Sequence, residues 1–324
     1  MKLLVTGGSG FIGSNYIKTI IDNPQVESVV NADIITYAGS LHNNQDYADH
    51  SKYTHINLDI RDGDAVCDAF SQFNPTHVVH FAAESHVDNS INGPRPFIET
   101  NITGTFNLIE AARSSNIIKF HHVSTDEVYG ELGRRGYFRE STPYNPRNPY
   151  SASKASADMI VRSYFHTFNV PIVITNCCNN YGPRQHREKF IPTIIRSLMK
   201  GDKVPVYGDG KNVRDWIYVD DHSSALWDVL LRGELGETYN IGARCEKTNI
   251  SVVLEICKAM GVTATEYITF IKDRPGHDLR YAIDNKKIIT KLGWNPETAF
   301  KLGVKKTVDW YKSNPAYLLE ECVH

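Results

Sequence analysis

Residues 2–13 read KLLVTGGSGFIG, a short apolar run that leads into a glycine-rich loop. The run predicts a strand over Lys2–Thr6, and the residues after the loop have the apolar spacing of a helix. Gly7, Gly10 and Gly13 allow a tight turn and let backbone N–H groups approach a pyrophosphate at the helix start. A plain tight turn would use glycines too, so the loop alone does not decide between the two interpretations.

A carboxylate at the end of the next predicted strand favours the dinucleotide site. Ser28–Ala32 reads as the second strand, and Asp33 follows it directly. Asp33 lies about twenty residues beyond the glycines, where dinucleotide-binding folds place the carboxylate that accepts from the ribose hydroxyls. The negative charge would repel a 2′-phosphate. The sequence therefore predicts NAD rather than NADP.

Strands and helices continue to alternate through the first half of the chain. This alternation predicts an α/β fold with a doubly wound, Rossmann-like parallel sheet. The expected strands are 53–59, 77–81, 116–123 and 171–176, and the expected helices are 62–73, 94–115 and 150–168.

The composition changes after residue 176: glycine, proline and charged residues become more frequent, and the predicted elements become shorter. We expect a helix over 190–200, a strand over 204–207 and a helix start at 246–249. The chain is thus predicted to hold an NAD-binding domain over 1–176 and a smaller C-terminal α/β substrate domain over 177–324, with some segments crossing back to the first.

Residues 123–154 gather four groups that can move protons: Asp126, Glu127, Tyr150 and Lys154. The two acids follow a predicted strand, at the sheet edge where ligands bind in open α/β folds. The tyrosine and the lysine share one helix face because they are four residues apart. A nearby ammonium is expected to lower the pKa of the phenol. The alternative is that the acids form a solvated turn.

Composition excludes several classes of function. The net charge of −2 gives no nucleic-acid footprint, and no apolar run is long enough to span a membrane. The N-terminus lacks a signal-peptide layout, so we expect a cytoplasmic protein. The cysteines have no zinc-site spacing, so we expect reduced thiols and no metal. The apolar residues of the predicted helix over 150–168 indicate either a homodimer contact or intramolecular core.

Several motifs resemble those of the extended short-chain dehydrogenase/reductases, and among them the dTDP-glucose 4,6-dehydratases. The resemblance covers nearly the whole chain, and the Thr-Asp-Glu triplet is its most specific mark. The motifs are AAESHVD (82–88), STDEVYG (124–130), YSASK (150–154), NCCNNYGP (176–183), VYGDG (206–210), RDW (214–216) and DRPGHD (273–278).

The resemblance implies a role for each catalytic residue. Tyr150, helped by Lys154 and Thr125, would remove the C4 hydroxyl proton while hydride passes from C4 to NAD. Glu127 would take H5, and Asp126 would protonate the departing C6 hydroxyl so that water leaves. Hydride would then return to C6 and give a 4-keto-6-deoxy sugar nucleotide.

The resemblance also implies two sets of binding residues. Those for NAD are Gly7, Gly10, Phe11, Ile12, Gly13, Asp33, Ile34, Thr36, Asp59, Ile60, Phe81, Ala82, Ala83, Ser85, Thr100, Tyr150, Lys154 and Asn180. Those for the sugar nucleotide are Ser85, His86, Thr125, Asn179, Lys189, Phe190, Pro205, Tyr207, Arg214, Asn249, Arg274 and His277.

Some positions depart from the family pattern, and they leave the preferred nucleotide base open. Asn89 stands where many members have arginine, and Cys178 replaces a common serine. Arg184, His186 and Arg187 replace the more usual aromatic and proline residues. Residues 147 and 148, Arg-Asn, precede a proline where small residues are frequent.

Two other classes of function remain open. A 4-epimerase or a UDP-glucuronate decarboxylase would share Tyr150, Lys154 and NAD, but it has no use for an acid that protonates a C6 hydroxyl. Asp126 therefore argues against both. A non-catalytic NAD-sensing protein could be built on the same fold, and it could dispense with the tyrosine and the lysine.

Overall fold

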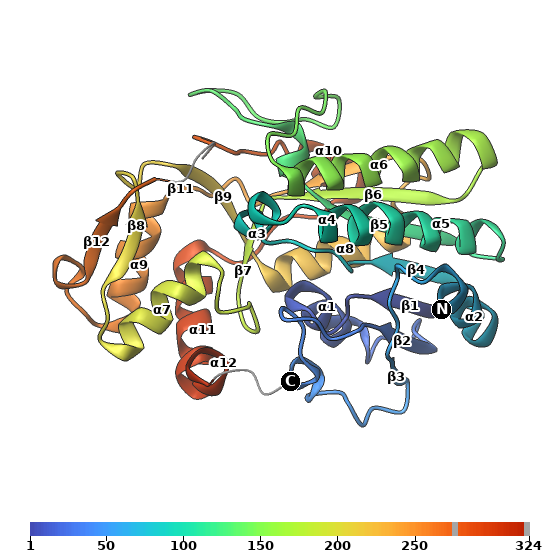
Figure 1. Cartoon of the computed structure of the whole chain (residues 1–324), viewed down its shortest axis with the longest axis horizontal. Helices are drawn as coiled ribbons and strands as arrows, with labels where there is room; N and C mark the ends of the chain where they lie inside the picture. The colour runs from blue at the N-terminus through green and yellow to red at the C-terminus, as the bar shows by residue number, and fades with distance from the viewer. Residues whose placement is uncertain (274–277, 321–324) are drawn as a thin grey trace.

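Seven parallel strands form the central sheet in the order β10-β6-β5-β4-β1-β2-β3, as the predicted fold class requires. The computed structural model, shown in Figure 1, describes residues 1–273 and 278–320. The strands of this sheet are β1 (Lys2–Thr6), β2 (Ser28–Ala32), β3 (Tyr53–Ile56), β4 (His77–His80), β5 (Lys119–Thr125), β6 (Ile172–Cys177) and β10 (Thr238–Ile241).

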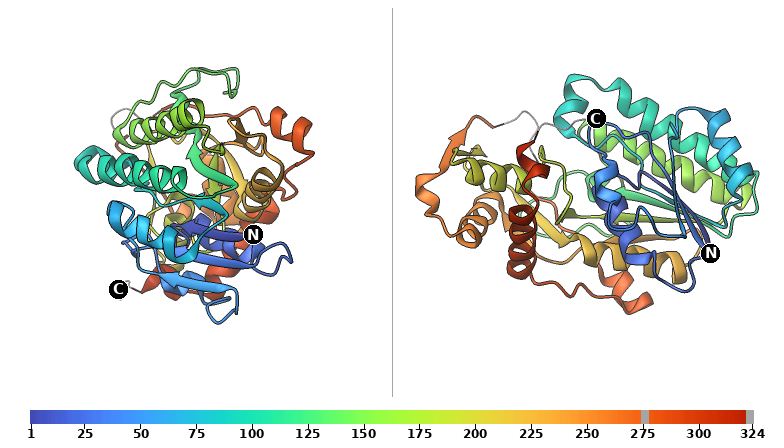
Figure 2. Two further views of the ribbon diagram at one scale, coloured as in Figure 1. Left: turned by 90° about the vertical axis from the view of Figure 1, so that its right-hand side faces the viewer. Right: turned by 90° about the horizontal axis from the view of Figure 1, so that it is seen from below.

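Side chains alternate along each strand, so the sheet buries apolar residues on both faces. In β1, Leu3 and Val5 join one apolar cluster and Leu4 joins the other. The first cluster is covered by α1 (Phe11–Ile20) and α8 (Val219–Arg232). The second is covered by α2 (Gly63–Phe73), α5 (Thr105–Arg113) and α6 (Pro149–Phe168), as Figure 2 also shows.

The C-terminal part of the chain builds a second lobe with its own apolar cluster, on the left in Figure 1. Its sheets are small because its elements are short. Their strands are β7 (Asn179–Tyr181), β9 (Val213–Tyr218) and β11 (Glu246–Thr248) in one, and β8 (Val204–Tyr207) and β12 (Ile268–Ile271) in the other. The helices of this lobe are α7 (Phe190–Lys200), α9 (Asn249–Met260), α11 (Phe300–Ser313) and α12 (Ala316–Leu319). Helix α10 (Lys286–Leu292) belongs to the first lobe, where Ile288 and Leu292 join the cluster that α1 and α8 cover.

The chain returns to the first lobe after it has entered the second. Strand β10 pairs with β6 in parallel, and α8 packs on the face that α1 covers. The boundary at residue 176 itself stays a prediction. Over residues 1–273 and 278–320, no helix is both long and apolar enough to cross a membrane.

Two predicted elements differ from the structure. The helix over 94–115 is helical from Arg95 to Arg113, but it contains a π-helical stretch, η2 (Ile98–Gly104), between α4 (Arg95–Phe97) and α5. The expected helix start at 246–249 is wrong for its first three residues, which pair with β9 as β11. Helix α3 (Val87–Asn92) is an element that the sequence pattern does not predict.

Candidate active site

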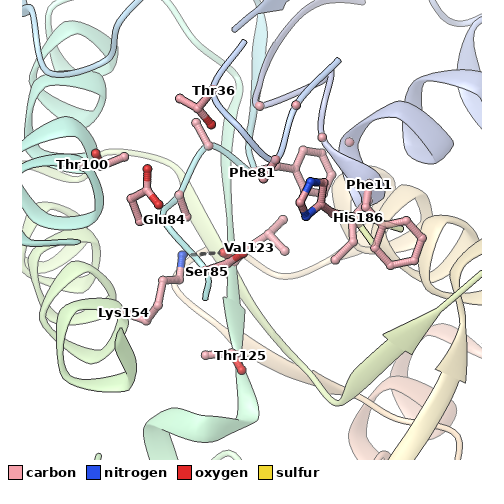
Figure 3. A pocket seen from close by; sticks show the side chains of 18 of the residues that line it. Phe11, Thr36, Phe81, Glu84, Ser85, Thr100, Val123, Thr125, Lys154 and His186 are labelled. Atoms are coloured by element: carbon pink, nitrogen blue, oxygen red, sulfur yellow. Dashed lines mark hydrogen bonds between the residues drawn. The ribbon is translucent and has the colours of Figure 1, made fainter. Parts of the chain in front are cut away.

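A cleft of about 350 Å³ opens at the carboxyl edge of the central sheet, where the glycine loop, the ends of β2 to β6 and the start of α6 meet. Figure 3 shows its lining from close by. Every residue predicted to bind the cofactor lines this cleft, and so do all five predicted catalytic residues. The structure thus brings the two groups together, while the contacts of each with a cofactor stay a prediction.

The glycine loop leaves the space that a pyrophosphate needs. Gly7 has a left-handed φ of +71°, and a Cβ there would lie 2.6 Å from the backbone nitrogen of Ala82. A Cβ on Gly13 would lie 2.3 Å from the carbonyl oxygen of Gly7. Among the described residues, no side chain caps the first turn of α1, and that turn holds no acidic residue. These features fit the dinucleotide that the loop predicts.

Asp33 is fixed in orientation by two backbone N–H groups. Ser9 donates to its Oδ2 at 3.0 Å, and Ile35 donates to its Oδ1 at 2.9 Å. Burial raises the pKa of this carboxyl, and the two backbone hydrogen bonds partly offset the rise. The carboxylate therefore lies beside the glycine loop, in reach of a ribose that follows the pyrophosphate.

Tyr150 and Lys154 lie in the first two turns of α6, on the face toward the cleft. The Lys154 ammonium donates to the carbonyl oxygen of Val123 at 2.9 Å, the dashed line in Figure 3. The expected lowering of the Tyr150 pKa is wrong. Burial and then the Glu127 carboxylate raise the pKa of the phenol well above its usual value, and a hydrogen bond with Thr125 offsets part of the rise.

Thr125 ends β5, and a single 3-10 turn, η3 (Asp126–Tyr129), follows it. The Thr125 hydroxyl accepts from the backbone N–H of Glu127 at 3.3 Å and so fixes the start of the turn. The turn directs both acids into the cleft, so the alternative of a solvated turn is wrong: Asp126 is only 2% exposed and Glu127 is half-buried.

The two acids occupy unequal environments. Burial, followed by the charges of Glu127 and Asp215, raises the pKa of Asp126 well above its usual value. Burial also raises the pKa of Glu127, but Arg214, Asn148 and Lys189 act against the rise. Burial and the neighbouring negative charges therefore favour the protonated form of Asp126, whereas Arg214, Asn148 and Lys189 favour the ionised form of Glu127.

Some of the predicted substrate residues line the cleft, and others lie outside its lining. Ser85, Thr125, Asn179 and Lys189 line the cleft, and the Lys189 ammonium donates to the carbonyl oxygen of Ser85 at 2.9 Å. The predicted residues that lie outside the cleft lining are His86, Phe190, Pro205, Tyr207, Arg214 and Asn249. Arg274 and His277 lie outside the described residues.

The residues that depart from the family pattern have defined structural partners. Arg184 is buried and donates to Asn15 Oδ1 at 2.8 Å, and it pairs with Asp46 at 2.5 Å. It therefore ties the segment after β7 to the first lobe. His186 lies in the cleft lining, with its Nδ1 3.7 Å from Glu188 Oε2.

Two further departures, Asn89 and Arg187, lie toward the surface. The Asn89 amide donates to the Tyr37 hydroxyl at 3.5 Å, and Arg187 donates to the carbonyl oxygen of Glu320 at 2.8 Å.

Sequence reasoning missed two amides that hold the walls of the cleft. Asn101, in the π-helical stretch, accepts from the Glu84 backbone and donates to Ser153 on α6 at 2.8 Å. Asn148 caps α6 and also contacts Glu127. These contacts join elements that are far apart in the sequence, so no local sequence pattern indicates them. The residues that line the cleft and were not predicted are Ala32, Ala38, Gly39, Leu58, Arg61, Glu84, Val123, Ser124, Cys177, Cys178, Gln185 and His186.

Comparison with known proteins places the chain among nucleotide-sugar dehydratases. A dTDP-glucose 4,6-dehydratase of Neisseria gonorrhoeae is 49% identical over 333 residues, covering 97% of this chain and 96% of the relative. The dTDP-glucose 4,6-dehydratase 1 of Escherichia coli K12 is 48% identical over 342 residues, covering 98% and 94%. The crystal structure of the Streptomyces venezuelae dTDP-glucose 4,6-dehydratase with NAD bound has a TM-score of 0.95 at 41% identity, covering 98% and 99%.

The family model described as GDP-mannose 4,6 dehydratase matches residues 4–307, which is almost the entire chain. Together with the two relatives, this match confirms the resemblance that the motifs indicate. The chain therefore belongs to the GDP-mannose 4,6 dehydratase family.

Proposed function

We propose that this chain is an NAD-dependent sugar-nucleotide 4,6-dehydratase that converts dTDP-glucose to dTDP-4-keto-6-deoxyglucose. One observation carries the proposal beyond fold and family. Two adjacent carboxyl groups, Asp126 and Glu127, lie in the cleft beside Tyr150, and their surroundings shift their pKa values to different extents. An elimination of water needs one acid and one base at the same time, and such a pair supplies both.

In the first step, Tyr150 accepts the proton of the C4 hydroxyl as C4 is oxidised. Its phenol must lose its own proton to do so, although burial and Glu127 hold that proton tightly. When bound in this cleft, NAD would supply the acceptor for the C4 hydride and the donor of the hydride that C6 receives. The Thr125 hydroxyl, hydrogen-bonded to the phenol, orients it.

In the second step, the ketone at C4 acidifies the proton on C5. Glu127 takes that proton, and the C5–H electron pair forms the C5–C6 double bond. Asp126, which keeps its proton because it is more deeply buried, donates it to the C6 hydroxyl, and water leaves. In the third step, as hydride returns to C6, Glu127 gives a proton back to C5. Glu127 is then restored, while Tyr150 holds the C4 hydroxyl proton and Asp126 lacks the proton that left with water. Loss of a proton from Tyr150 to solvent and uptake of one by Asp126 balance each other and restore the starting state.

The same geometry separates this proposal from its rivals. A 4-epimerase or a decarboxylase needs Tyr150 and Lys154 but has no use for a buried, protonated Asp126 beside a second acid. Keeping such a pair costs stability, because an unpaired buried carboxyl is expensive in either form. A non-catalytic NAD sensor would have no use for that costly arrangement either.

The test is to incubate the purified protein with dTDP-glucose and, separately, with UDP-glucose, in heavy water. A dehydratase yields a product that has lost one water and carries deuterium at C5. An unchanged mass with inverted C4 would identify an epimerase and refute the proposal. The relative rates with the two substrates also establish which nucleotide base the enzyme prefers.

We further propose that the enzyme is a homodimer, formed through α5 and α6, which lie side by side in Figure 1. Val161 and Tyr164 of α6 are buried within the chain, so part of this helix serves the core. Phe106, Met159 and Phe168 remain 44% to 58% exposed on the same two helices. Light scattering should give a molecular mass twice that of the monomer. The variant Met159→Glu should have the mass of a monomer.

A further inference from the structure

One side chain contacts both halves of the proposed chemistry. Asn148 precedes α6 and caps it: its Oδ1 accepts from the backbone N–H of Ser151 at 2.9 Å, and the Ser151 hydroxyl accepts from the backbone N–H of Asn148 at 3.2 Å. The Nδ2 of the same side chain donates to Glu127 Oε2 at 3.5 Å. The residue that starts the helix of Tyr150 therefore also touches the carboxylate on η3.

The orientation of this amide follows from its partners. The backbone N–H of Ser151 can only donate, so the oxygen of Asn148 must face the helix. The NH₂ group then points away from the helix, toward Glu127. A serine or threonine caps a helix equally well, but its single hydroxyl has no second group for the carboxylate.

The contact matters because Glu127 has few neighbours that favour its charged form. Arg214 and Lys189 act on it at a distance, and both are engaged elsewhere: Arg214 donates to the carbonyl oxygen of Asp278 at 3.0 Å, and Lys189 donates to Ser85. Asn148 is the neighbour whose hydrogen bond to this carboxylate favours ionisation.

The other titratable groups that face Glu127 are carboxyl groups and phenols, which do not favour its negative charge. Asp126 precedes it on η3, Tyr150 faces it from α6, and Asp278 and Tyr281 face it from the segment after β12. The adjoining Arg147 pairs with Glu131 and lies 3.4 Å from Asp278 Oδ1, which holds the residue before the cap in place.

We propose that Asn148 is a positioning residue that ties the Glu127 carboxylate to the first turn of α6, so that the elimination base and Tyr150 are held as one unit. The inference rests on the proposed function, because it gives Glu127 the role of base. Removing the amide while keeping the cap should leave Tyr150 in place and make Glu127 harder to ionise.

The experiment compares Asn148→Ser, Asn148→Asp and Ser151→Ala with the wild type. Both substitutions at 148 keep an oxygen that can cap the helix, whereas Ser151→Ala weakens the cap and does not touch Glu127. Single-turnover water loss from dTDP-glucose and deuterium entry at C5 are measured across pH, together with the melting temperature.

We expect the acidic limb of the elimination rate to move to higher pH by about 0.5–1 unit in Asn148→Ser, since a hydrogen bond to a charged group is lost. In Asn148→Asp a like charge replaces the donor, and the shift should be about 1–2 units. Ser151→Ala should lower the melting temperature and leave the limb unmoved.

An unshifted limb in Asn148→Ser would overturn the inference, whatever Asn148→Asp does. So would an equal shift in Ser151→Ala, because the cap alone would then explain it. Failure of the proposed function looks different: the wild type itself would not remove water from dTDP-glucose.

Discussion

Replacing Glu127 with glutamine separates oxidation from elimination. The substitution keeps the shape of the side chain, and the glutamine oxygen can still accept from the Asn148 amide. It removes a negative charge that, together with burial, raises the pKa of Tyr150. The same charge also raises the pKa of Asp126. Oxidation at C4 should therefore proceed, and at lower pH than in the wild type, while the proton on C5 has no acceptor.

The expected loss in the rate of water elimination follows from the role of Glu127 as a general base. General base catalysis is worth about 10² to 10⁴ in rate, which corresponds to about 3 to 5.5 kcal/mol of barrier. Water loss should fall by that factor. Bound NADH should appear on mixing with substrate and persist, because hydride cannot return to C6 until the elimination has occurred.

The assay follows NADH absorbance in a stopped-flow instrument and deuterium entry at C5 by mass spectrometry. Asp126→Asn is the matched control: it keeps the base, so exchange at C5 should continue while water loss slows. The reasoning is refuted if Glu127→Gln removes water at nearly the wild-type rate. It is also refuted if both variants are slowed equally in every step, since the acids would then only shape the turn.

Three further outcomes are expected. Tyr150→Phe should reduce turnover by about a hundredfold or more while NAD and sugar nucleotide still bind, as equilibrium titration would show. The purified protein should contain NAD and bind NADP much more weakly, because Asp33 would repel the 2′-phosphate; extraction of mainly NADP would contradict this. Asp126→Asn should raise the melting temperature at neutral and alkaline pH. The folded state holds the Asp126 proton well above the ordinary pKa of 3.8, so this carboxyl costs stability as pH rises from there, and the amide does not.

The features that could be predicted from the sequence are those fixed by local geometry. The glycine loop needs a left-handed φ at Gly7 and close backbone approach, and only glycine provides both without strain. Asp33, Thr125 and Glu127 lie at or just after the ends of buried strands, and parallel strands bring their carboxyl ends to one edge. Each of these positions could therefore be assigned to the cleft before any fold was known.

The features that could not be predicted depend on segments far apart in the sequence. The pKa of Tyr150 is raised because other elements bury it and bring Glu127 near, and neither effect is visible in the spacing of Tyr150 and Lys154. The π-helical stretch over Ile98–Gly104 could not be predicted either, because apolar spacing does not distinguish it from an ordinary α-helix.

The division of labour between the two acids requires both lobes. Burial at the edge of the first lobe is the main cause that raises the pKa of Asp126 and so favours its protonated form. The positive groups that favour ionisation of Glu127 come from the second lobe: Arg214 from β9 and Lys189 from the residue before α7. If the lobes moved apart, Glu127 would lose these charges, and the two carboxyl groups would differ less in their readiness to ionise. In the proposed mechanism, packing of the second lobe against the sheet edge therefore contributes to the elimination step through the charges that it places near Glu127.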